Sequence, residues 1–136
     1  MISIQNLNFK YNRKNSVFSD ITLNIAQGNI YGLLGENGVG KTTLLRLISG
    51  LLFPDSGTCH TFGADAKKRI PSMLQKIYYL PEEISIPPTK VWDYGKIYGQ
   101  MYPNFSNQQF AQYLTLFNID AEKKMSQPPT DSRKKQ

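Results

Sequence analysis

The sequence predicts an α/β fold organised around a glycine-rich loop. Residues 30–34 are a short apolar run typical of a buried strand, residues 35–43 are rich in glycine, and residues 44–52 have the apolar spacing of a helix. A strand, a glycine loop and a helix in this order form a recurrent phosphate-binding unit. Apolar and polar residues alternate before residue 30, which adds a small sheet that we expect to be antiparallel.

The glycine loop carries a specific motif. Gly35, Gly40, Lys41 and Thr42 fit the spacing G-x-x-x-x-G-K-[ST], with the required strand before it and helix after it. Glycines allow the backbone N–H groups to approach phosphate oxygens, at a helix N-terminus that favours negative charge. The predicted nucleotide-binding residues of this loop are Asn37, Gly38, Val39, Gly40, Lys41, Thr42 and Thr43.

Three side chains of the loop have separate predicted roles. Lys41 supplies a positive charge for the β- and γ-phosphates, and the Thr42 hydroxyl is a ligand for Mg²⁺. Thr43 is expected to hydrogen-bond a phosphate nearer the sugar. A glycine-rich turn that binds nothing is the alternative, but the flanking strand and helix favour a site for a nucleoside triphosphate.

Composition sets limits on the class of protein. The chain has 136 residues, enough for one modest domain, with 40% hydrophobic and 12% aromatic residues. No apolar run approaches the roughly 18 residues that span a bilayer, and the N-terminus lacks the features of a signal peptide. We therefore expect a soluble protein that is not exported.

Charge and cysteine content suggest no further chemistry. The net charge of +6 is concentrated in short clusters at 67–69, 123–124 and 133–135, which indicates solvated or partner-facing charge and no nucleic-acid surface. Cys59 is the only cysteine, so an internal disulfide is excluded, and its strand position favours a packed thiol. His60 is interpreted as a strand-surface residue.

The first half of the chain has a clear order of elements. Residues 2–11 and 21–25 alternate as half-buried strands, and residues 27–29 turn tightly into the strand at 30–34. The helix after the loop ends before Pro54, and strands follow at 58–62 and 77–80. Residues 65–76 are ambiguous, with Pro71 able to open a short helix. The predicted apolar stripe of the helix after the loop is Leu44, Leu47, Ile48 and Leu51.

The second half is predicted to be helical. Thr89 is a plausible N-cap for a first helix, and Ser106 with Gln109 forms a capping-box pattern before a second helix. The apolar stripe expected on the first helix is Val91, Tyr94, Tyr98 and Met101. Beyond Ala121 the chain is polar and basic, which predicts a disordered or frayed tail.

Over about residues 1–120 the chain resembles the ATP-binding subunit of ABC transporters. The loop at 35–43, the helix to Phe53 and the turn Pro54–Gly57 match that family's pattern, and the stretch 79–83 is similar to its ABC-2 exporters. The resemblance implies an incomplete P-loop NTPase domain of the ABC type. It divides the chain into a nucleotide-binding core at 1–84, a helical subdomain at 85–120 and a tail at 121–136.

The resemblance also implies roles for individual residues. Tyr11 corresponds to an aromatic residue that stacks on adenine, although packing on the sheet edge is the alternative. Glu82 stands where the family usually has glutamine, and its carboxylate is either a ligand for Mg²⁺ or a solvated surface group. The helices at 89–118 would receive a permease, and Trp92 and Tyr94 are either part of that surface or ordinary core.

The family's hydrolytic groups are not matched. The stretch 128–135 corresponds to the signature of the family, but Pro129 has no N–H group and Asp131 brings a negative charge. No strand ending in a Mg²⁺-binding aspartate follows. We expect a chain that binds ATP and hydrolyses it poorly, with low stability and an exposed apolar edge at 30–34.

The sequence therefore predicts an ATP-binding subunit, or its N-terminal part, that binds Mg-ATP and energises a transmembrane permease. By resemblance, its partners are that permease and a second ATP-binding subunit, in a homo- or heterodimer on the cytoplasmic face of the cell membrane. The alternative is a non-catalytic nucleotide-sensing or interaction module, or a gene remnant. The permease would select the transported substrate.

Overall fold

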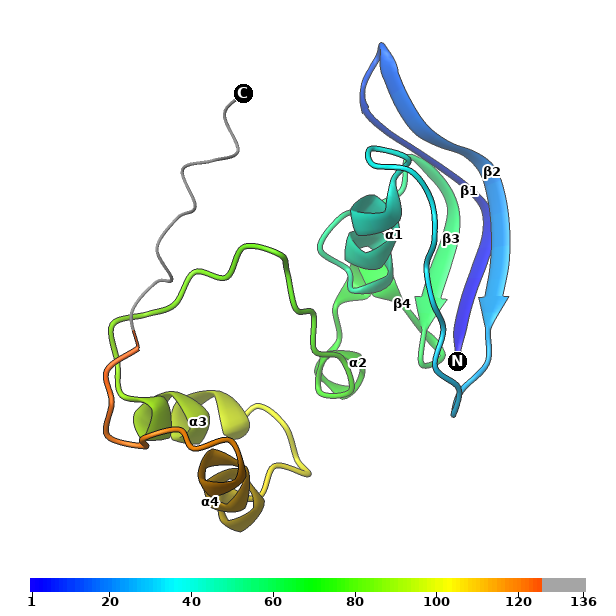
Figure 1. The fold of residues 1–136 in the computed structure, drawn as a ribbon. Helices are drawn as coiled ribbons and strands as arrows, with labels where there is room; N and C mark the ends of the chain where they lie inside the picture. The colour runs from blue at the N-terminus through cyan, green and yellow to red at the C-terminus, as the bar shows by residue number, and fades with distance from the viewer. Residues whose placement is uncertain (126–136) are drawn as a thin grey trace, which may run out of the picture. The chain divides into compact units, whose positions relative to one another are not determined.

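The computed structural model describes residues 1–125 and divides the chain into two compact units (Figure 1). The first unit runs from Met1 to Tyr79, and the second begins at Leu80. This boundary lies close to the one predicted after residue 84. Among residues 1–125, no helix combines the length and the apolar character needed to cross a membrane.

The first unit contains a four-stranded antiparallel sheet in the order β2-β1-β3-β4 (Figure 1). Its strands are β1 (Ile2–Asn12), β2 (Asn15–Ile25), β3 (Ser56–Thr61) and β4 (Ala64–Asp65). In the central strand, Ile4 pairs with Leu23 of β2 on one side and with Cys59 of β3 on the other. The predicted antiparallel sheet at the N-terminus is thus confirmed.

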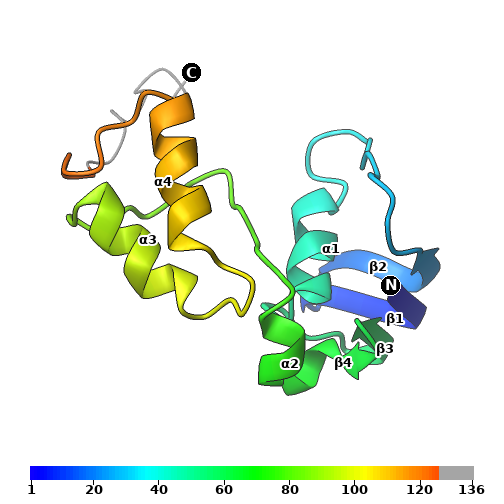
Figure 2. The ribbon, with the colours of Figure 1, turned by 90° about the horizontal axis from the view of Figure 1, so that it is seen from below.

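Helix α1 (Lys41–Ile48) packs on one face of this sheet (Figure 2). It buries Leu44, Leu47 and Ile48, as the apolar spacing predicts, but Leu51 lies beyond the helix end and is exposed. Gly50 ends the helical path with a positive φ of 67°. The buried cluster consists of Ile4, Leu7, Phe9, Phe18, Leu44, Leu47, Ile48, Cys59, Ala66 and Met73.

The ambiguous segment at 65–76 contains two short helices. A 3₁₀ turn, η1 (Ala66–Lys68), follows β4, and α2 (Pro71–Leu74) begins with proline at its first position. Between them Arg69 adopts a left-handed conformation and donates from Nη1 to the Gly50 carbonyl at 2.6 Å. This bond pairs a carbonyl in the turn that follows α1.

Two predicted strands are absent. Within the described part of the chain, residues 30–34 and 77–80 lie outside every strand. Ile30 is 104% exposed and Leu34 is 93% exposed, so the expected exposed apolar edge is confirmed, whereas the expected buried strand is wrong. Apolar character alone does not form a strand, because a strand requires a neighbour for its backbone hydrogen bonds.

The second unit contains helices α3 (Val91–Gly99) and α4 (Asn107–Leu116). The predicted cap of α4 is confirmed, because the Ser106 hydroxyl accepts from the Gln109 N–H at 3.3 Å. The predicted Thr89 cap of α3 is wrong, since Lys90 occupies the cap position and contributes no side-chain cap.

Backbone carbonyls replace the missing cap of α3. Val91 N–H donates to the Lys123 carbonyl at 3.1 Å, and Trp92 N–H donates to the Ala121 carbonyl at 3.0 Å. Residues 121–125 are therefore held against the start of α3, and the predicted frayed tail is wrong for them. Residues 126–136 lie outside the described part of the chain, as does the predicted signature stretch.

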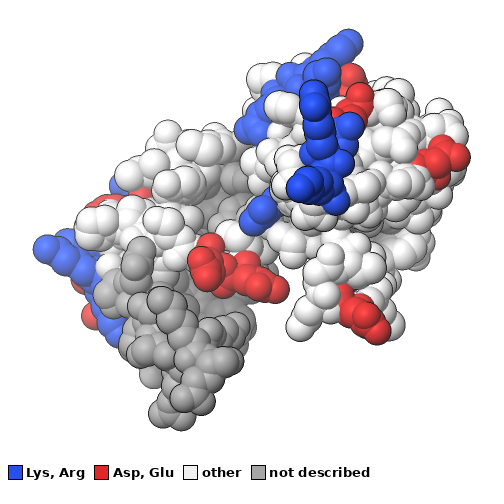
Figure 3. All heavy atoms as spheres, turned by 90° about the horizontal axis from the view of Figure 1, so that it is seen from above, with Lys and Arg blue, Asp and Glu red and all other residues white. Residues whose placement is uncertain are grey.

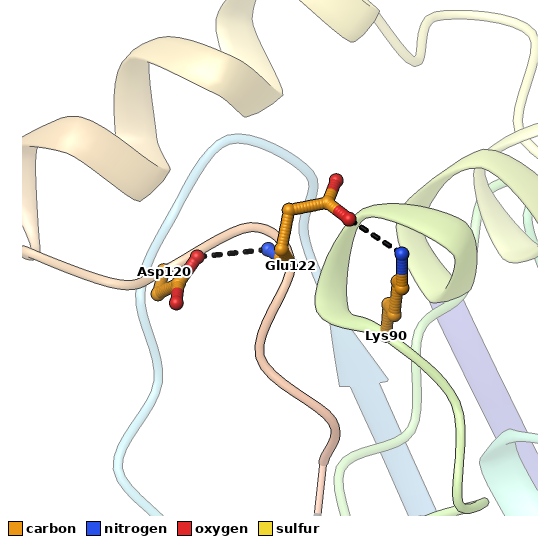
Figure 4. A network of polar contacts seen from close by, with 3 residues as sticks. All are labelled: Lys90, Asp120 and Glu122. Atoms are coloured by element: carbon orange, nitrogen blue, oxygen red, sulfur yellow. Dashed lines mark hydrogen bonds and ion pairs between the residues drawn. The ribbon is translucent and has the colours of Figure 1, made fainter.

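A polar network accompanies this contact (Figure 4). Lys90 Nζ lies 2.5 Å from Glu122 Oε2, and the Glu122 N–H donates to Asp120 Oδ1 at 2.9 Å. The hydrogen bond with Glu122 raises the pKa of Lys90. Because both charged side chains are exposed, the ion pair itself stabilises the contact only slightly.

Helices α3 and α4 meet through glycines and aromatic rings. Gly95 and Gly99 are the buried residues of α3, and a Cβ atom placed on them would lie 2.2 Å from the Phe110 ring and 2.3 Å from the Phe105 ring. Trp92 stacks on Phe110 with ring centroids 5.8 Å apart. The stripe predicted for α3 is therefore wrong in its second half, where Tyr98 and Met101 are exposed; Trp92 and Tyr94 are half-buried.

The glycine contact predicts an unusual response to substitution. In an exposed helix, glycine to alanine stabilises by about 1 kcal/mol, but Gly95→Ala would force the Phe110 ring from its place and destabilise by about 1–3 kcal/mol. Urea unfolding followed by the fluorescence of Trp92 measures this effect. Lys96→Ala, an exposed change on the same helix, is the control and should alter stability by less than about 0.5 kcal/mol. Stabilisation by Gly95→Ala would contradict the packing described here.

Candidate functional site

The glycine loop lies at the N-terminus of α1 and depends on two left-handed glycines. Gly38 has a φ of 86° and Gly40 has a φ of 108°. A Cβ atom on Gly40 would lie 2.7 Å from Val17 Cγ1 and 2.9 Å from Phe18 Cζ. Conformation and space both require glycine at position 40, so β2 fixes the place where the helix begins.

The first turn of α1 presents free N–H groups. The first intrahelical bond runs from the Leu44 N–H to the Gly40 carbonyl at 2.9 Å, so Lys41, Thr42 and Thr43 have no acceptor within the helix. No side chain caps this end and no acidic residue lies in its first turn. The helix dipole and these donors make the position attractive to an anion.

Lys41 folds back over the loop. Its Nζ atom donates to the carbonyls of Gly35 and Glu36, each at 2.7 Å. The ammonium group thus lies over the loop, and the two carbonyls are partners that it can exchange for phosphate oxygens. Thr42 is exposed at the same end, where its hydroxyl is open to a ligand.

Strand β1 brings an aromatic ring to the same helix turn. The Tyr11 hydroxyl lies 2.9 Å from Thr43 Oγ1, and the Phe9 and Tyr11 rings form a T-shaped pair with centroids 5.0 Å apart. Tyr11 is 50% exposed, whereas Thr43 is 5% exposed. The structure therefore places the sequence-predicted aromatic residue directly beside the glycine loop.

Arg46 is a neighbour of this site that sequence analysis did not find. A side-chain hydrogen bond with Tyr79 is the main cause that raises the pKa of Arg46, and Tyr11 adds a smaller contribution. Arg46 follows Thr43 by three residues, so both lie on the same face of α1. This helical spacing was a signal in the sequence, but the approach of Tyr11 and Tyr79 depends on tertiary structure.

The remaining predicted site residues are more dispersed. Asn37 and Val39 are exposed at the tip of the loop. Glu82 is also exposed, but it belongs to the second unit, so its pairing with Thr42 around Mg²⁺ stays a prediction. Within residues 1–125, no group of three or more acidic, histidine or cysteine side chains is arranged to hold a metal ion.

Cys59 is excluded as a nucleophile of this unit. It is 2% exposed in β3, with Sγ 3.8 Å from the Leu47 carbonyl. Burial raises the pKa of its thiol to about 11, so the reactive thiolate is scarce at neutral pH. The packed thiol predicted from the sequence is confirmed.

The basic side chains form no continuous stripe on the face drawn in Figure 3. Lysine and arginine lie in separate groups on that face, with acidic side chains nearby. This distribution agrees with short, separate clusters of positive charge in the sequence.

Comparison with known proteins decides the family. Residues 18–133 match the protein family described as ABC transporter. The chain belongs to this family. Its sheet, glycine loop and helices are a partial P-loop NTPase fold, as the sequence predicts.

Relatives within the ABC transporter family are ATP-binding proteins. The chain is 37% identical over 123 residues to the ABC transporter ATP-binding protein YtrB of Bacillus subtilis (strain 168), covering 88% of this chain and 41% of YtrB. It is 35% identical over 109 residues to an energy-coupling factor transporter ATP-binding protein of Ligilactobacillus salivarius, covering 79% of this chain and 32% of that protein. The chain thus spans less than half the length of these relatives.

Solved structures of ABC proteins share the fold. An ATP-binding ABC transporter protein from Pyrococcus furiosus matches with a TM-score of 0.72 and 34% identity, over 90% of this chain and 60% of that one. The ATP-binding subunit of another ABC transporter matches with a TM-score of 0.78 and 19% identity, over 93% and 56% of the two chains.

Proposed function

We propose that this chain binds Mg-ATP at the loop 35–43, as part of an ATP-binding subunit that energises a membrane permease. The observation that carries the proposal is the meeting of three features at one point: the free N–H groups of α1, the glycine loop and the Lys41 ammonium. Together they form a site for several phosphate groups in a row.

Each part of the ligand has a proposed partner. The N–H groups from Gly38 to Thr42 bind the phosphate oxygens, and Lys41 exchanges its carbonyl partners for the β- and γ-phosphates. The Thr42 hydroxyl binds Mg²⁺. The exposed face of Tyr11 stacks on the base, with a stabilisation of about 1 kcal/mol.

The partners follow from the family. Relatives carry names of transporter ATP-binding proteins, so we propose that this chain works beside a transmembrane permease on the cytoplasmic face of the membrane, paired with a second ATP-binding subunit. The exposed aromatic and aliphatic residues of the second unit, which include Ile97, Tyr113 and Phe117, are the surface we propose for the permease.

Titration with a series of nucleotides tests the proposal. We expect saturable binding of Mg-ATP to the 136-residue chain, weaker binding of Mg-ADP, and binding of AMP at least about tenfold weaker than that of Mg-ATP, since each lost phosphate removes charge-assisted hydrogen bonds. Isothermal titration calorimetry measures all three. Equal affinity for AMP and Mg-ATP, or no binding by a chain shown to be folded by circular dichroism, would contradict the proposal.

A further inference from the structure

Two adjacent threonines at the start of α1 have different surroundings. Thr42 is exposed, while Thr43 is only 5% exposed and sits against the buried face of the helix. The Thr43 hydroxyl already has a partner, the Tyr11 hydroxyl at 2.9 Å. The loop motif predicts that both threonines act on the phosphate and metal end of the ligand, but the two side chains differ in burial and in partners.

Tyr11 is fixed at both ends of its side chain. Its ring packs on the Phe9 ring in a T-shaped arrangement with an interplanar angle of 85°, and its hydroxyl bonds to Thr43 Oγ1 across a sequence separation of 32 residues. Phe9 and Tyr11 are two residues apart in β1, so their side chains lie on the same face of the strand. Phe9 is itself part of the buried cluster. Half of Tyr11 is exposed, so the held ring still offers a surface to a ligand.

We propose that Thr43 is a positioning residue whose hydroxyl holds Tyr11 in the orientation that receives the base. This inference rests on the proposed function and deepens it, because it assigns Thr43 to the base end of the ligand instead of the phosphate end. The β-branched Thr43 side chain has only two main rotamers in a helix, so its hydroxyl has few alternative positions. A ring that is already ordered loses less entropy when a base stacks on it.

Arg46 supports the same arrangement. It lies one turn after Thr43 on α1, and Tyr79, with a smaller contribution from Tyr11, raises the pKa of its guanidinium group. Tyr11 is therefore bonded to the first turn of α1 through Thr43, and Arg46 in the second turn adds a favourable electrostatic interaction. The Tyr11 ring, which we propose to receive the base, and the phosphate loop are thus both positioned by helix α1.

The test compares Mg-ATP with Mg-tripolyphosphate, which has the phosphates but no base. We expect Tyr11→Phe and Thr43→Val each to weaken Mg-ATP binding by about three- to tenfold, and the double variant to weaken it no more than either single variant. Affinity for Mg-tripolyphosphate should be unchanged in all three. Thr43→Ser, which keeps the hydroxyl, should restore most of the Mg-ATP affinity.

Controls separate this inference from the proposed function. Tyr31→Phe removes another half-exposed tyrosine hydroxyl from the first unit and should leave both affinities unchanged. Equal weakening of Mg-tripolyphosphate and Mg-ATP by Thr43→Val, or additive effects of the two single variants, would overturn the role of Thr43 while leaving nucleotide binding intact. Failure of the unaltered chain to bind either ligand would overturn the proposed function and this inference together.

Discussion

Replacing Lys41 with alanine should weaken Mg-ATP binding by about 100-fold. The Lys41 ammonium is the cation that the structure places over the glycine loop, where it donates to the Gly35 and Glu36 carbonyls at 2.7 Å. Its removal takes away charge-assisted bonds to phosphate. Isothermal titration calorimetry with Mg-ATP measures the loss.

A matched lysine gives the control for this prediction. Lys14 lies exposed in the turn between β1 and β2 of the same unit, so Lys14→Ala changes the net charge equally without touching the loop. Its Mg-ATP affinity should stay within about twofold of the unaltered chain, because a solvated charge away from the ligand is screened by salt. If Lys41→Ala and Lys14→Ala behaved alike, binding would depend on overall charge and not on the loop.

Truncation of Leu47 should destabilise the first unit by about 2–5 kcal/mol. Leu47 is completely buried on α1, in the cluster that joins this helix to the sheet. Alanine would leave a cavity there and remove much of the apolar contact that holds the helix. Since folded domains are stable by only about 5–15 kcal/mol, the loss is a large fraction of the total.

Leu45 offers a comparison on the same helix. It is 46% exposed, so Leu45→Ala should change stability by less than about 0.5 kcal/mol. Urea unfolding by far-ultraviolet circular dichroism, with hydrogen exchange of peptides from residues 1–79, measures both variants. Comparable destabilisation by Leu45→Ala and Leu47→Ala would show that α1 does not pack on the sheet by the face described.

Helix α3 of the second unit shows why only part of the fold could be predicted from the sequence. The stripe predicted for α3 followed large apolar side chains, but the helix contacts α4 through Gly95 and Gly99. Glycine has no apolar side chain. Hydrophobic periodicity therefore cannot predict a contact between an aromatic ring and the backbone at a glycine. The capping of α3 by the Ala121 and Lys123 carbonyls could not be predicted from residue types either, because every residue has a backbone carbonyl.

In the first unit, sequence alone determined the phosphate-loop motif, the buried face of α1 and the antiparallel alternation of β1 and β2. These features are local, because they depend on residue type and short-range spacing. Tertiary structure decided which apolar runs became strands and which polar groups met. Residues 30–34 form no strand, and the Tyr11 hydroxyl lies beside Thr43 Oγ1. Neither result could be predicted locally, because both depend on contacts between segments far apart in the chain.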